Sequence, residues 1–324
     1  MIGWLERWQI PLYLVALGAG AAFGLLAPST APGLEQAINP ALMILLYATF
    51  LGVPLTRLGR ALRDGRFLAG LLVLNFAVVP VVVYGLSRFI ADDQALLLGV
   101  LLVLLTPCID YVIVFSGLAG AAHDRLLAAA PLLMLVQMLL LPVYLGLFMG
   151  PELFDVIDVA PFIEAFLLLI VTPLALAAIT QFLAARSAAA RRVMDLMEAL
   201  MVPLMMVTLT VVVASQIDAV RADLSSLLRV IPVYVAFLVV MVPLGILTGR
   251  VFRQDAPASR ALVFSGATRN SLVILPLALA LPDSLSLVGV VVVTQTLVEF
   301  VGMVTYVRLI PRVVTHRPTP SPTR

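Results

Sequence analysis

The sequence contains no lysine, one cysteine and very few charged residues of any kind. Charged residues make up 12% of its 324 residues, and all 20 basic residues are arginines; soluble domains carry about twice that charged share. The arginines fall between apolar runs, so the net charge of +2 gives no reason to expect a nucleic-acid partner. The single cysteine, Cys108, excludes an intramolecular disulfide, and the absence of CxxC and His-rich patterns predicts no metal site.

The chain also lacks the groups that an intramembrane enzyme would use. It has no lysine and no HExxH motif, and both histidines, His123 and His316, fall in a predicted loop or tail. Asp110 has no second aspartate near it inside a span, so no aspartate pair is available for general acid–base work. We therefore expect a protein that is not an enzyme and has no cofactor, apart from Na+ or H+ as a coupling ion.

Long apolar runs are what the sequence does contain. Hydrophobic residues make up 62% of the chain, and runs of about 20 of them, enough to cross a bilayer core of ~30 Å, recur along its whole length. The pattern predicts an all-α polytopic protein of the lipid bilayer. Ten spans are predicted, near residues 10–27, 37–55, 67–90, 95–119, 126–149, 162–185, 194–216, 227–248, 259–282 and 284–309.

The arginines predict the orientation of these spans. With ten spans and a cytoplasmic N-terminus, only Arg88, Arg221 and Arg229 fall on the outer side and Arg269 falls inside a span; the other sixteen lie on the inner side. This excess matches the positive-inside rule. The prediction is a multi-pass protein of the plasma (inner) membrane with both termini cytoplasmic.

Proline positions predict an internal repeat. Five residue pairs recur in order at an offset of 162 or 163: Pro11 and Pro173, Pro40 and Pro203, Pro80 and Pro243, Thr106 and Thr268, Gln137 and Glu299. An odd number of spans per repeat inverts the second copy, and inverted repeats are typical of secondary transporters. We predict a first five-helix repeat at 1–160, a second inverted repeat at 161–310 and a disordered cytoplasmic tail at 311–324.

Two spans at equivalent positions of the repeats carry helix-breaking segments. The fourth span contains "TPCID" and the ninth contains "SGATRNS". Freed backbone groups are tolerated at membrane depth only where they are buried in protein or line a cavity, and such interrupted helices form transporter substrate sites. A further motif, the small pair Gly20 and Gly24, predicts ordinary close packing of helices.

Three charged residues, Asp110, Arg269 and Glu299, are placed deepest in the membrane. A central charge costs ~2.5–3.5 kcal/mol on insertion scales, so such residues are usually paired or functional. Asp110 and Arg269 lie on the two breaks and either form a structural ion pair or face substrate or a coupling ion. Glu299 either binds sodium, carries a proton or ties helices together by hydrogen bonds, with its repeat partner Gln137. Other polar residues predicted at the site are Thr268, Asn270, Ser271, Thr294, Gln295 and Thr296.

The stretches "PCIDYVIVFSGLAG" and "LLMLVQMLLLPVYLGLF" resemble spans 4 and 5 of the arsenite-efflux permeases in the bile acid:sodium symporter superfamily. "SGATRNS" and "VVVTQTLVEFVGMVTYV" similarly resemble that family's span 9 crossover and span 10. The resemblance implies ten helices in two inverted repeats, with a core domain that contains crossing broken helices 4 and 9 and moves against a panel domain. It also implies a functional cysteine in span 4, which Cys108 matches, although a thiol there is also an ordinary packing residue.

The chain departs from that family where a span 9 glutamate is expected. The matching position is Leu272, and Arg269 takes the place of one of two paired asparagines, which leaves Asn270. Because Asp110 and Leu272 are 162 residues apart, we hypothesise that Asp110 replaces the missing acid and that Arg269 balances it. The predicted substrate-binding residues are Cys108, Asp110, Arg269 and Asn270; the predicted ion-coupling residues are Gln137, Thr268, Ser271, Gln295 and Glu299.

Two transport functions remain open on these residues. The first is ion-gradient-coupled efflux of arsenite or antimonite, with the thiol on the path because sulfur is a soft ligand. The alternative is sodium-coupled symport of an organic anion such as a bile-acid-like carboxylate, which Arg269 would meet. The partners expected are the bilayer and a small inorganic or organic anion or metalloid; the sequence gives no oligomeric state.

Overall fold

The computed structural model describes residues 8–52, 64–109, 111–150, 164, 167–279 and 281–315, which are helical almost throughout. Polar caps explain where several helices begin. The carboxylates of Asp64, Asp93 and Asp255 each accept a hydrogen bond from an amide in the first turn that follows. Such capping satisfies donors that have no partner inside the helix. The helices of the described residues are α2 (Gln9–Leu26), α3 (Ala31–Gly52), α5 (Gly65–Val73), α6 (Val79–Ser87), α7 (Gln94–Leu104), α8 (Tyr111–Leu118), α9 (His123–Met149), α12 (Thr172–Ala184), α13 (Ala188–Ala222), α14 (Leu224–Val251), α15 (Ala256–Ala267), α16 (Ser271–Leu279) and α17 (Leu287–Val313).

Eight helical segments in the described part of the chain are long and apolar enough to cross a membrane. One of them joins α5 and α6 through a π-helical turn, Leu74–Val78. The two predicted spans that are not among the eight, 95–119 and 259–282, are each divided into two shorter helices, α7 with α8 and α15 with α16. The described residues are thus all-helical, and the chain is a polytopic membrane protein.

Several predicted boundaries were wrong. Helix α13 extends six residues beyond each end of the span predicted at 194–216. The second span was expected from residue 37, yet α3 begins at Ala31, directly after a 3-10 turn that starts at Pro28. Proline favours the first turn of a helix, and residues 31–36, which include a proline, a glycine and a glutamate, were taken for a loop. The tail was expected from residue 311, but α17 continues to Val313 with Pro311 inside it. Residues 316–324 lie outside the described part.

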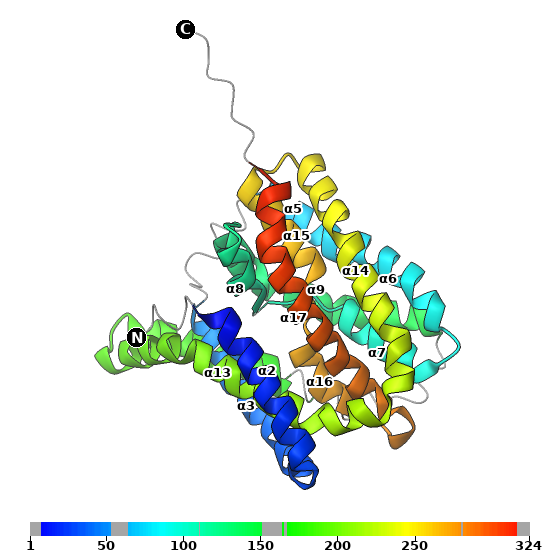
Figure 1. Ribbon diagram of the computed structural model, residues 1–324. Helices are drawn as coiled ribbons and strands as arrows, with labels where there is room; N and C mark the ends of the chain where they lie inside the picture. The colour runs from blue at the N-terminus through cyan, green and yellow to red at the C-terminus, as the bar shows by residue number, and fades with distance from the viewer. Residues whose placement is uncertain are drawn as a thin grey trace.

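The helices form two groups (Figure 1). Helix α13 packs along α2 and α3, and α12 packs on α3; α17 lies between this bundle and a second group that includes α7, α14, α15 and α16. The predicted glycine pair lies where α2 meets α13. A Cβ atom added to Gly24 would come within 2.3 Å of the Ala214 carbonyl oxygen, and one on Gly20 within 2.8 Å of the Thr210 oxygen. The prediction of close packing at these glycines is confirmed.

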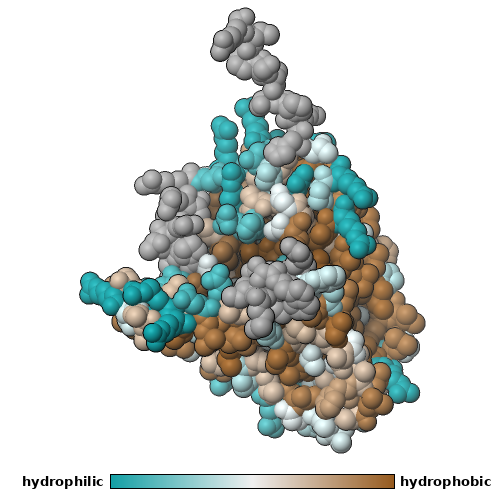
Figure 2. Space-filling view, turned by 60° about the vertical axis from the view of Figure 1, so that its left-hand side comes forward, coloured by the Kyte–Doolittle hydropathy of each residue, from teal (hydrophilic) through white to brown (hydrophobic). Residues whose placement is uncertain are grey.

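The outer surface is apolar over much of its area. Figure 2 shows hydrophobic residues covering the middle of one face, with hydrophilic ones gathered mainly toward its upper part and edges. Leu26, Phe89 and Leu139 are 86%, 77% and 74% exposed, although they are large hydrophobic residues. Exposed apolar area of this extent needs a nonaqueous environment, and it agrees with a protein that spans the bilayer.

Candidate functional site at the crossing of two interrupted helices

The two interrupted spans cross each other through main-chain hydrogen bonds. Between α7 and α8, and again between α15 and α16, the chain is extended, and Pro107 and Arg269 form an antiparallel bridge. The Cys108 amide donates to the Thr268 carbonyl oxygen at 3.1 Å, and the Asn270 amide donates to the Thr106 carbonyl oxygen at 2.9 Å. Backbone groups that left the helices therefore find partners in the opposite segment, as burial requires. We call these two segments, 105–109 and 268–270, the crossing.

Side chains beside the crossing explain why both helices stop there. Pro107 has no amide hydrogen to continue α7. The hydroxyls of Thr106 and Thr268 each donate back to the carbonyl four residues earlier, both at 2.7 Å. The Asn270 side-chain oxygen accepts from the Val273 amide at 3.2 Å and so begins α16.

The bonds of the crossing follow the 162-residue offset found in the sequence. Adding 162 to Pro107 gives Arg269, so the bridged residues are equivalent. The same shift turns the donor Cys108 into Asn270 and the acceptor Thr106 into Thr268, so the two inter-segment bonds exchange with each other. The two threonine bonds correspond in the same way. The inverted arrangement of the remaining spans stays a prediction.

Arg269 is fully buried, and oxygen atoms of three spans surround its guanidinium. Nη2 donates to Asn75 Oδ1 at 2.9 Å and to the carbonyl oxygens of Ser265 and Gly266 at 2.5 and 2.8 Å. Nη1 donates to the Leu104 carbonyl oxygen at 3.3 Å. No carboxylate of the described residues lies within ion-pair distance of this group. Asp110 lies outside the described residues, so its pairing with Arg269 and its substitution for the missing acid stay predictions.

Glu299 connects α17 to the crossing. Its Oε2 accepts from the Arg269 main-chain amide at 2.8 Å and from Gln295 Nε2, and its Oε1 lies 2.6 Å from the Tyr111 hydroxyl. The same hydroxyl lies 2.8 Å from the Arg269 carbonyl oxygen. One hydroxyl proton cannot serve two acceptors fully. A proton on Glu299, donated to Tyr111, would let Tyr111 donate to the carbonyl and would satisfy all three groups.

Several buried polar side-chain atoms have no hydrogen-bond partner, and three of them belong to residues on the crossing or bonded to Glu299. Among the described residues these atoms are Asn270 Nδ2, Gln295 Oε1, Arg269 Nε and, on α9, Gln137 Oε1. Unpartnered buried polar atoms are rare and call for an explanation such as a bound solute or water. Two of these atoms are donors and two are acceptors.

The comparison with known families gives a clear match. A model of the sodium bile acid symporter family matches residues 39–223, more than half of the chain. The chain belongs to the sodium bile acid symporter family. The match includes the first segment of the crossing, and α14 to α17 lie beyond it. No curated protein matches the chain significantly.

Membership of the symporter family makes the chain a membrane transporter of a small anion or organic substrate and points in general to sodium-coupled transport. It does not distinguish arsenite efflux from symport of a bile-acid-like anion. Most of the predicted site residues do meet. Cys108, Thr268, Arg269 and Asn270 lie on the crossing; Glu299 and Gln295 bond to it or to each other, and Ser271 Oγ accepts from Thr296 Oγ1 at 2.7 Å.

Gln137 is less closely connected than its repeat partner. It is 2% exposed on α9, and no hydrogen bond joins it to Glu299 or to the crossing among the described residues. Its assignment as an ion-coupling residue stays a prediction.

Two residues of this candidate site were missed by the sequence analysis. Asn75, in the π-turn of the third span, orients the Arg269 guanidinium, and its Nδ2 donates to the Leu71 oxygen and to Ser265 Oγ, both at 3.0 Å. A side-chain amide in the apolar run "LLVLNFAVVP" was the available signal. Tyr111 was missed because a tyrosine in an apolar span is usually interpreted as a residue that packs in the core.

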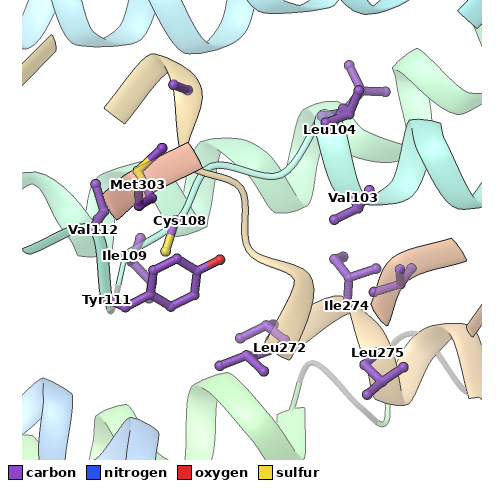
Figure 3. Packing of buried hydrophobic residues seen from close by; sticks show 14 of the residues in the cluster. Val103, Leu104, Cys108, Ile109, Tyr111, Val112, Leu272, Ile274, Leu275 and Met303 are labelled. Atoms are coloured by element: carbon purple, nitrogen blue, oxygen red, sulfur yellow. The ribbon is translucent and has the colours of Figure 1, made fainter. Parts of the chain in front are cut away.

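The Cys108 thiol lies at the crossing itself. Cys108 is 1% exposed and forms no disulfide. Figure 3 shows it on the extended segment next to Tyr111, whose hydroxyl is turned toward the segment that joins α15 and α16. The sulfur of Met303 is also near, since it lies 3.4 Å from Thr268 Oγ1. The crossing therefore combines soft sulfur atoms with a carboxyl group.

Proposed function

We propose that this family member exports arsenite or antimonite from the cytoplasm across the plasma membrane, with both termini cytoplasmic. The observation that carries the proposal is the position of Cys108, whose amide takes part in the crossing of the two interrupted helices. Thiol sulfur is a soft ligand that suits a metalloid. The unpartnered atoms of Asn270 and Gln295 offer a donor and an acceptor to the hydroxyl groups of neutral As(III).

A proton is the coupling ion that fits the hydrogen bonds best. When the Glu299 carboxyl is ionised, the single Tyr111 hydroxyl proton has to serve both Glu299 and the Arg269 carbonyl oxygen. When the carboxyl is protonated, Glu299 and Tyr111 each have a proton to donate. Exchange of a proton on Glu299 against the metalloid would use this alternation. We expect the bundle of α2, α3, α12 and α13 to act as a panel against which the crossing moves, because alternating access in such folds rocks one group of helices against another.

Sodium-coupled uptake of an organic anion is the second candidate. The family's name favours it, and a buried arginine is a natural partner for a carboxylate. Against it, the terminal nitrogens of Arg269 already donate to four protein oxygens, and only Nε has no partner among the described residues. A substrate carboxylate would have to displace part of this set.

The test is arsenite accumulation in everted membrane vesicles with an imposed proton gradient. We expect gradient-driven uptake by the wild type, loss of uptake in Cys108→Ser, and loss of gradient dependence in Glu299→Gln. Vesicles that lack the protein set the background, and variant levels and melting temperatures show whether each variant is folded.

If well-folded wild type takes up no arsenite but takes up a bile acid in a Na+-dependent manner, the second candidate holds instead. If Cys108→Ser takes up arsenite as well as the wild type does, the Cys108 thiol does not contact the transported metalloid.

A further inference from the structure

The Arg269 guanidinium closes the C-terminal ends of two half-helices at once. Leu104 is the last residue of α7, and Ser265 and Gly266 lie in the last turn of α15. Their three carbonyl oxygens all accept hydrogen bonds from the guanidinium. Carbonyls in the last turn of a helix have no intrahelical partner, so the arginine satisfies groups that would otherwise be orphaned inside the membrane.

The charge of these helix ends matches one cation. A helix C-terminus carries the equivalent of about half a negative charge, so the ends of α7 and α15 together attract about one positive charge. Arginine keeps its charge in proteins. With Arg269 fully buried, the low dielectric of its surroundings strengthens this attraction.

The fourth oxygen is fixed in the same role. Asn75 Nδ2 donates to Leu71 O and Ser265 Oγ, which leaves Asn75 Oδ1 as the acceptor that faces Arg269. Three main-chain carbonyls and one amide oxygen are hard, neutral ligands, and helix C-terminal carbonyls beside unwound backbone are the groups with which transporters hold Na+. Glu299 does not compete for the guanidinium, because it accepts from the Arg269 main-chain amide.

We propose that Arg269 is a built-in cation that fills an alkali-cation site formed by Leu104, Ser265, Gly266 and Asn75. The crossing then assembles without Na+, and removal of the arginine side chain leaves a site that Na+ occupies. This inference goes beyond the proposed substrate. Its test measures stability in the absence of substrate. The cation proposal can therefore fail while metalloid transport is confirmed, and metalloid transport can fail while the cation proposal is confirmed.

The experiment compares melting temperatures of purified protein in NaCl and in choline chloride at equal ionic strength. We expect no difference for the wild type and a saturable rise with NaCl for Arg269→Ala. Arg260→Ala is the matched control: Arg260 also donates to carbonyl oxygens at helix ends, including those of Ala119 and Val314, but it is only half-buried. Water can reach those carbonyls, so Arg260→Ala should show no preference for Na+.

Three results would overturn the proposal. One is equal melting of Arg269→Ala in both salts. Another is a saturable Na+ stabilisation of the wild type that Asn75→Leu removes. If Arg269→Ala cannot be purified, Arg269→Lys and Arg269→Met decide, because they are similar in length and differ in charge. We expect the Arg269→Lys variant to fold and to melt at the same temperature in both salts, and the Arg269→Met variant to be purified in little or no yield. Equal yields of the two variants would show that the site does not require a positive charge.

Discussion

At the scale of single residues, the hydroxyl of Tyr111 is the group that links the crossing to Glu299. It lies 2.6 Å from Glu299 Oε1 and 2.8 Å from the Arg269 carbonyl oxygen, and the ring packs against Phe115 and Phe300. Loss of the hydroxyl leaves two buried oxygens with one partner fewer, while the ring still fills its space. A buried group left without its partner costs about 1–3 kcal/mol.

We expect Tyr111→Phe to lower stability by this amount and to reduce proton-driven transport at least tenfold. Tyr234→Phe is the matched control, because Tyr234 is buried and donates to the Val291 carbonyl oxygen away from the crossing. It should lose similar stability and keep transport. The measurements are melting temperature and gradient-driven uptake in vesicles. Equal transport in both variants would remove Tyr111 from the coupling mechanism.

Residue types predicted part of the site and missed the rest for a physical reason. Arg269 and Glu299 were found because a charge in the membrane is costly enough to imply a role. Their mutual arrangement was not predictable, because it depends on main-chain bonds formed only when two distant segments cross. Asn75 was missed because its importance comes from which oxygen its amide presents, and that is fixed by Leu71 and Ser265.

At the scale of helices, α2 and α13 depend on a close approach of their backbones. Gly24 and Gly20 leave no room for a Cβ against Ala214 and Thr210, and Thr210 Oγ1 donates to the Ala16 carbonyl oxygen at 3.2 Å across the same contact. In membranes such contacts rest on packing rather than on exclusion of water. Loss of contact at one glycine therefore affects the whole helix pair.

We expect Gly24→Ala to destabilise the protein by about 1–3 kcal/mol, since the added methyl group meets backbone atoms that cannot move independently. Gly18→Ala, two turns earlier on α2, is the control, because nothing lies within 4 Å of a Cβ added there and Gly18 is exposed. It should leave melting unchanged or raise it slightly. Equal melting of the two variants would show that α2 and α13 tolerate a wider separation.

Sequence patterns predicted the helices better than their ends. Apolar runs located every helix in the part of the chain that the structure describes, and the motifs "TPCID" and "SGATRNS" located both interruptions. The start of α3 was misplaced because a proline, a glycine and two polar residues, Glu35 and Gln36, follow Ala31, and such a stretch resembles a loop. The π-turn at Leu74–Val78 left no signal in hydropathy, which records composition and not the hydrogen-bond pattern.

At the scale of the whole molecule, the uneven distribution of arginines predicts how the protein sits in the membrane. Arg250 lies in the last turn of α14 and Arg253 in the loop before α15, whereas Arg221 lies in the last turn of α13. The positive-inside rule places Arg250 and Arg253 in the cytoplasm and Arg221 outside.

Single cysteines at Arg221 and Arg250 test this orientation. Both residues are exposed, and the native Cys108 is buried, so the unmodified protein is the background for labelling. With a membrane-impermeant maleimide on intact cells, we expect Arg221→Cys to be labelled and Arg250→Cys to be labelled only after permeabilisation. The reverse pattern would invert the predicted topology and with it the direction assigned to transport.

The crossing of the two interrupted helices is held by main-chain hydrogen bonds, so the side chains there can change as such proteins diversify. Cys108 and Asn270 contribute their amides to the crossing, and Thr106 and Thr268 contribute their carbonyl oxygens. Every residue except proline carries both an amide hydrogen and a carbonyl oxygen. Evolution can therefore replace the side chains at the crossing without dismantling it. A single scaffold can therefore present different side chains, and with them different chemistry, at the crossing.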